Sequence, residues 1–128
     1  MSLKRHNPKG VSLMGRYSHA VEVPPGQRLL YVSGQVGVDS KGKTAAGIEK
    51  QCDLVWKNIG AILRSAGMGY ADIVKINAYL TDARFIGAYR SVRDKYVHDP
   101  MPASTLALVA GLASPDMLVE VEVVASRT

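Results

Sequence analysis

The sequence has little of what several kinds of functional site require. It contains one cysteine, so neither a disulfide within the chain nor a cluster of cysteine metal ligands is possible. Its three histidines, His6, His19 and His98, lack the i, i+4 spacing of a metal-binding pair. A P-loop is also absent, because the segment GQVGVDSKG has no lysine–serine end. We therefore expect no metal and no cofactor.

Long hydrophobic runs are missing as well. No apolar run approaches the roughly 18 residues that a transmembrane helix needs. The N-terminal segment MSLKRHNPKG is basic but has no apolar stretch behind it, so it does not match a secretory signal. We expect a cytoplasmic protein that has no membrane partner.

Positive charge is concentrated at one end of the chain. The net charge is +5, and four of the 16 basic residues lie within the first 16 positions, where no acidic residue occurs. The remaining 12 basic residues are nearly balanced by 11 acidic ones. Because the body is close to neutral, we expect no specific nucleic-acid partner. We predict a flexible basic tail over residues 1–10, followed by a single domain over residues 11–128.

Hydrophobic periodicity divides the domain into helices and strands. Ile48, Cys52, Val55 and Ile59 follow i, i+4, i+7, i+11 spacing, which is one face of an amphipathic helix. Gly67 is the residue expected just past the end of that helix, and Cys52 is expected as a buried, inert thiol. The predicted strands are residues 16–23, 28–38, 72–80, 104–110 and 117–125, and the predicted helices are residues 45–66 and 82–97.

The resulting order is β-β-α-β-α-β-β, an α+β arrangement. Each helix has one apolar face, so both helices can cover the same side of a single sheet. We assign Glu120, Glu122 and Val124, together with Leu106 and Leu108 of the preceding strand, to the side without helices. A mixed polar and apolar face of this kind predicts an oligomer interface or a ligand pocket.

Several segments of the chain match one known family in order and spacing. They are GRYSHAV, LLYVSGQVGVD, RSAGM, ADIVKINAYLTD, PAS and VEVEVVA. On these segments, residues 11–127 resemble the RidA family, also called YjgF. The resemblance implies a chorismate-mutase-like subunit with one mixed sheet, assembled as a homotrimer around a central barrel, with three clefts between subunits. It also implies hydrolysis of reactive enamines and imines to a keto acid and ammonia.

The resemblance implies a set of cleft residues too. Tyr17, Ser33 and Gly34 match residues that line the cleft in the family. Glu120 matches the glutamate that positions a water molecule. Each has a structural alternative: Glu120 as an exposed strand residue, Tyr17 as a core aromatic, and Ser33 with Gly34 as a bulge.

Besides Arg16, which replaces the proline before the tyrosine, three positions depart from the family pattern. Ser104 stands where the family has an arginine that grips the substrate carboxylate with a bidentate pair. Leu106 stands where a cysteine is common, and Tyr89 where an asparagine lines the cleft. We assign all three to substrate binding. A charge-assisted hydrogen bond contributes about 1.5–3 kcal/mol, so without the arginine we expect the usual small imino acids to be poor substrates.

Three functions remain open at this point. The first is a deaminase acting on a different enamine, imine or related small molecule. The second is a non-catalytic trimer that binds a small ligand or regulates a partner. The third is an endoribonuclease or translation inhibitor, against which the balanced charge of the body and the lack of a histidine pair both count.

Overall fold

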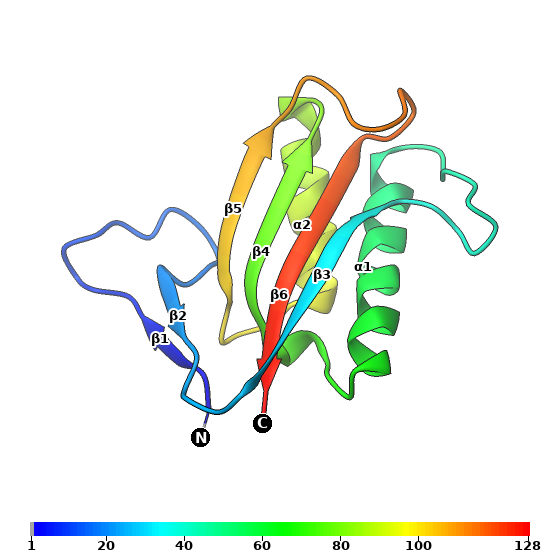
Figure 1. The fold of residues 1–128 in the computed structure, drawn as a ribbon. Helices are drawn as coiled ribbons and strands as arrows, with labels where there is room; N and C mark the ends of the chain where they lie inside the picture. The colour runs from blue at the N-terminus through cyan, green and yellow to red at the C-terminus, as the bar shows by residue number, and fades with distance from the viewer. Residues whose placement is uncertain (1) are drawn as a thin grey trace.

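The computed structural model describes residues 2–128 and shows a four-stranded sheet with two helices on one of its faces (Figure 1). The α+β class and the placement of both helices on the same side of one sheet are as predicted. The elements are β1 Lys4–His6, β2 Ala20–Glu22, β3 Arg28–Val36, α1 Ile48–Ser65, β4 Ile73–Leu80, α2 Ile86–Tyr96, β5 Ala103–Leu108 and β6 Val119–Arg127, with short 3₁₀ turns at Tyr70–Asp72 and Ala83–Phe85.

The main sheet is mixed, with strand order β3-β6-β4-β5. Strand β6 is antiparallel to both β3 and β4, whereas β4 and β5 are parallel. A parallel pair needs a crossover connection, and α2 supplies it. The strand expected over residues 16–23 is shorter than predicted, and it pairs with β1 in a separate two-stranded sheet.

The core lies between the helices and the sheet. Cys52, Val55 and Ile59 of the predicted stripe are fully buried there. Burial raises the pKa of the Cys52 thiol to about 12, so it is the inert thiol that was expected. Gly67 lies just past the end of α1, as predicted, and its φ of 69° is in the left-handed region. The amide of Met68 closes this Schellman turn by donating to the carbonyl of Leu63 at 2.9 Å.

The N-terminal residues differ from the predicted flexible tail. Residues 4–6 form β1, which pairs antiparallel with β2, so that Arg5 lies opposite Val21. The Arg5 guanidinium also donates to the carbonyl oxygens of Pro100 and Met101. Backbone pairing and these side-chain bonds together hold a segment that its sequence alone assigns to solvent.

Candidate functional site

Ser33 and Gly34 form a bulge in β3. Val32 pairs with Val123 and Gln35 with Val121, so β3 has one residue more than β6 between the two pairs. The bulge that was considered as a structural alternative is therefore present. Ser33 and Gly34 are both exposed at this point.

The carboxylate of Glu120 lies directly against this bulge. A Cβ added to Gly34 would stand 1.8 Å from the Oε2 atom of Glu120 and 2.8 Å from its carboxyl carbon. Only a residue without a side chain allows so close an approach. Within residues 2–128, Glu120 has no hydrogen bond and no ion pair, and its one interaction is electrostatic, with Tyr79. Half-buried and unpaired, this carboxylate is available to water or a ligand.

Glu122 lies on the same face but is already engaged. The Tyr79 hydroxyl donates to its Oε1 atom at 2.6 Å. That hydrogen bond is the main cause of a raised pKa of Tyr79, and the charges of Glu122 and Glu120 add to it. Sequence reasoning did not place Tyr79 in the site. The alternation of residues 73–80, which puts Tyr79 on the open face, was the signal that pointed to it.

The register of β5 places its side chains differently from the prediction. Ser104 pairs with Ile76 and Leu106 with Ala78, and both partners are buried beneath the helices. Because paired residues share a face, Ser104, Leu106 and Leu108 belong to the helix side of this edge strand. The assignment of Leu106 and Leu108 to the helix-free face is therefore wrong. Leu106 packs partly against the core, and Ser104 is half-buried.

Tyr17 lies near the beginning of β5. The amide of the next residue, Ser18, donates to the Pro102 carbonyl at 2.9 Å, and Ser18 forms an isolated bridge with Ala103. The Tyr17 ring is half-buried, and its hydroxyl oxygen accepts from the amide of Met14 at 3.1 Å. The structure thus brings Tyr17 to the end of the strand that carries Ser104.

Tyr89 does not belong to the site. Its side chain is 1% exposed and lies in the hydrophobic core. Burial raises the pKa of its hydroxyl, which has no hydrogen-bond partner within residues 2–128. The assignment of Tyr89 to substrate binding is corrected, because helix α2 points this position at the core rather than at solvent.

The remaining residues form two groups in one chain. Ser33, Gly34 and Glu120 are on the open side of the sheet, where β3 meets β6. Tyr17 and Ser104 are at the β5 edge, and β4 lies between that strand and β6. A single chain therefore keeps the Glu120 carboxylate apart from the Ser104 hydroxyl.

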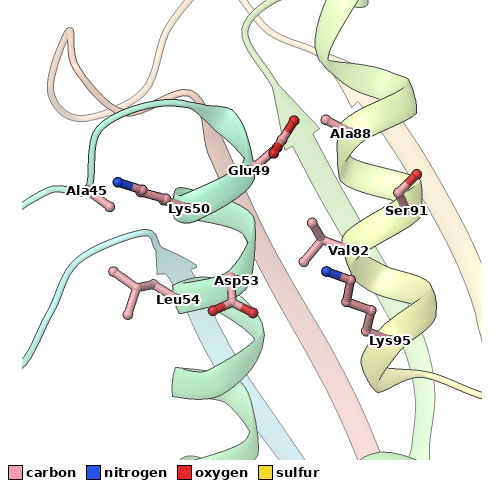
Figure 2. A pocket seen from close by; sticks show the side chains of 9 residues that line it. All are labelled: Ala45, Glu49, Lys50, Asp53, Leu54, Ala88, Ser91, Val92 and Lys95. Atoms are coloured by element: carbon pink, nitrogen blue, oxygen red, sulfur yellow. The ribbon is translucent and has the colours of Figure 1, made fainter.

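The groove between α1 and α2 is a separate hollow of about 670 Å³ (Figure 2). Asp53 of α1 and Lys95 of α2 both project into it. Hydrogen bonds from Tyr96 and Lys57 lower the pKa of Asp53, so this carboxylate is already paired. None of the sequence-predicted site residues lines the groove.

Among residues 2–128, no group of three or more His, Cys, Asp or Glu side chains suits a metal ion. In the same part of the chain, neither helix has the length and apolar character needed to cross a membrane.

The chain matches known proteins over most of its length. Residues 9–127 fit the family model described as Endoribonuclease L-PSP. A 2-iminobutanoate/2-iminopropanoate deaminase from Mus musculus is 34% identical over 91% of this chain and 85% of its own length. The crystal structure of RidA from the Antarctic bacterium Psychrobacter sp. superposes with a TM-score of 0.73 at 33% identity, covering 89% of this chain and 90% of that one.

A Rid-family protein from Yersinia pestis, YyfB, has a higher TM-score of 0.82 at 27% identity, covering 98% of both chains. The match to the Yersinia pestis protein covers 98% of this chain, so it extends into the N-terminal segment that precedes residue 9, where the family model begins. Ser33, Gly34 and Glu120 on the open side, and Tyr17 at the β5 edge, thus lie on a fold shared with these proteins. The chain belongs to the Endoribonuclease L-PSP family, which is the RidA (YjgF) family.

Proposed function

We propose that the protein hydrolyses an enamine or imine other than the usual small 2-imino acids, in clefts between the subunits of a homotrimer. The observation that carries this proposal is the Glu120 carboxylate, which lies against Gly34 without a hydrogen bond or ion pair within residues 2–128. The deaminase named among the relatives supports the class of reaction.

In this proposal, Glu120 holds the attacking water. The water oxygen bonds to the carbon of the C=N group, the π electron pair moves to nitrogen, and the carboxylate accepts a proton from the water. Glu120 returns this proton to nitrogen, which gives a carbinolamine. Glu120 then passes the proton of the carbinolamine hydroxyl to nitrogen, so that the C=O bond forms as the C–N bond breaks, and a carbonyl compound and ammonia leave. Water and substrate supply every atom of the products, so the step needs no cofactor.

A second copy of the chain is proposed to complete the cleft. Ser104 and Glu120 project from opposite sides of the sheet, so one cleft can contain both only if they come from different subunits. Leu29 and Tyr31 support this assembly, since they alternate onto the open face and are 51% and 73% exposed. Large apolar side chains gathered on one face are typical of an interface.

The test is ammonia release from an enamine generated in situ by an amino-acid deaminase. General acid–base groups contribute about 10²- to 10⁴-fold to rate, so Glu120→Gln is expected to lower kcat/KM by about 100-fold or more. Glu122→Gln is the matched control, because it removes the same charge two residues away on the same face. Equal rates for the parent and Glu120→Gln would contradict the proposed role. If the parent hydrolyses no imine yet binds a small ligand, the non-catalytic trimer is the correct function.

Substrate preference is tested separately at Ser104. With serine in place of the family's carboxylate-binding arginine, we expect little hydrolysis of 2-iminopropanoate by the parent. Ser104→Arg is expected to raise that activity by about tenfold or more, the value of one charge-assisted hydrogen bond. Rapid hydrolysis of 2-iminopropanoate by the unmodified protein would show that the arginine at this position is not required.

A further inference from the structure

A second hollow, of about 410 Å³, lies between the N-terminal segment and the chain that leads into β5. Its lining includes Arg5, Arg16, Tyr17, Asp99 and Met101. The volume is within the range of small-molecule sites. Of the residues implied by the family resemblance, Tyr17 is the one that lines it, so this hollow joins the candidate site to the N-terminal strand.

Arg5 brings an uncompensated charge to this hollow. Its Nε atom lies 3.4 Å from the Met101 carbonyl oxygen, and its Nη2 atom lies 3.2 Å from that of Pro100. Within residues 2–128, no carboxylate forms an ion pair with it. A guanidinium has five N–H donors, so the two bonds to neutral carbonyls leave donors free and the full positive charge in place.

Arg16 is the other arginine of the hollow, and its charge is compensated. Its guanidinium lies 3.1 Å from a carboxylate oxygen of Asp94 and 3.7 Å from one of Asp99. Asp94 also pairs with Arg93 at 3.0 Å. Arg16 and Arg93 are thus paired with aspartates, whereas Arg5 has no carboxylate partner within residues 2–128.

Tyr17 supplies a hydrogen-bond donor beside that charge. Its oxygen accepts from the Met14 amide, which leaves the hydroxyl proton available to a ligand. The hydroxyl of Ser18, by contrast, is committed to the Met101 carbonyl at 2.6 Å. A forked cation together with a phenol donor is a combination suited to a carboxylate.

We propose that this hollow binds a carboxylate at the far end of the substrate, with Arg5 as its cation. The inference rests on the proposed hydrolysis and names its substrate class. The proposed function places Ser104 in the cleft where the reaction occurs. Ser104 lies three residues beyond Met101, whose carbonyl binds Arg5, and three residues span about 10 Å along an extended chain. The carboxylate therefore lies several bonds away from the reacting carbon, in a longer molecule than a 2-imino acid.

Binding is tested with hexanoate and hexanamide, which share a shape but differ in charge, by titration of the assembled full-length protein at low salt. Hexanoate is expected to bind more tightly than hexanamide. Arg5→Gln is expected to weaken hexanoate by about 10- to 100-fold. Lys4→Gln is the matched control, because it removes the same charge from the neighbouring exposed position of β1.

Arg5→Lys and Tyr17→Phe separate ligand contacts from loss of structure. Arg5→Lys keeps the charge and is expected to retain part of the affinity, and Tyr17→Phe removes only the donor. The inference is overturned if hexanoate does not bind, if hexanamide binds equally well, or if Arg5→Gln matches the parent.

Activity gives an independent readout. The imine of 6-aminohexanoate, generated in situ by an amine oxidase, is expected to be hydrolysed faster than that of hexylamine by the parent but not by Arg5→Gln. Hydrolysis of both imines at one rate by the parent would reject the carboxylate site while leaving the proposed reaction standing. Carboxylate binding without hydrolysis of any imine would reject the reaction instead.

Discussion

The two faces of the main sheet come from the same strands but differ in what covers them. On β6, Val119, Val121 and Val123 point toward the helices and are at most 2% exposed. Glu120 and Glu122 alternate with them and are half-buried on the open side. The helix face is completed within one chain and provides the stability of the fold. The open face is left with polar groups and exposed aromatic surface, and it is therefore the face available for assembly and chemistry.

The largest expected effect comes from placing one carboxylate on either face of the main sheet. Val123→Asp puts a carboxylate into the core, which costs several kcal/mol, and is expected to unfold the protein. Val124→Asp changes the next residue, which pairs with Tyr31 on the open face. We expect that variant to keep its circular dichroism spectrum but to lose the trimer.

Light scattering at micromolar concentration measures the second outcome. The parent is expected near three times 13.8 kDa and Val124→Asp near 13.8 kDa. A monomeric parent, or a Val124→Asp variant of unchanged mass, would show that the open face is not the subunit interface.

A smaller effect is expected at the contact between Gly34 and Glu120. In Gly34→Ala the new methyl group occupies the place of the Glu120 carboxylate, so the flexible side chain must move away. Unfolding free energy is expected to fall by about 1 kcal/mol, while kcat/KM falls as far as in Glu120→Gln. The control is Gly34→Ala combined with Glu120→Ala, where no stability should be lost at position 34. A loss that persists in the double variant would place the strain in the backbone of the bulge.

The smallest effect is a difference between two tyrosines. Tyr89 on the helix side and Tyr79 on the open side both have a raised pKa, by burial in the first and mainly by the bond to Glu122 in the second. Each raised pKa favours folding below the unfolded value of about 10, and this contribution is lost as the pH rises through the folded pKa. Glu122→Gln is expected to lower the pKa of Tyr79 and leave Tyr89 unchanged. Carbon-13 NMR of labelled tyrosine measures both, and a parallel shift of the two would contradict the separation of causes.

The sequence predicted best those features that depend on a regular period. The helix stripe through Cys52, Val55 and Ile59 and the alternation of β6 follow directly from helix and strand geometry. Strand β5 was placed on the wrong side because it is an edge strand with side chains partly exposed on both faces. Its register depends on the parallel pairing with β4, which local pattern does not encode.

The N-terminal strand was missed for a different reason. Its three residues, KRH, have no apolar pattern, and Arg5 binds carbonyls that are 95 and 96 residues away in the sequence. Tyr89 was misassigned because it was aligned to a family position by spacing, whereas helix α2 turns it into the core. Glu120 and Gly34 were found by resemblance, but their mutual contact required the structure.

The packing of Glu120 on Gly34 also constrains how this chain can change over generations. Shortening residue 120 first leaves room for a side chain at position 34, so both substitutions can then accumulate at little cost. Filling position 34 first displaces the carboxylate while the proposed reaction still requires it. The two orders are not equivalent, and descendants that abandon the hydrolytic role are expected to change position 120 before position 34. A side chain at position 34 is therefore expected only in descendants that have already lost the proposed role of Glu120.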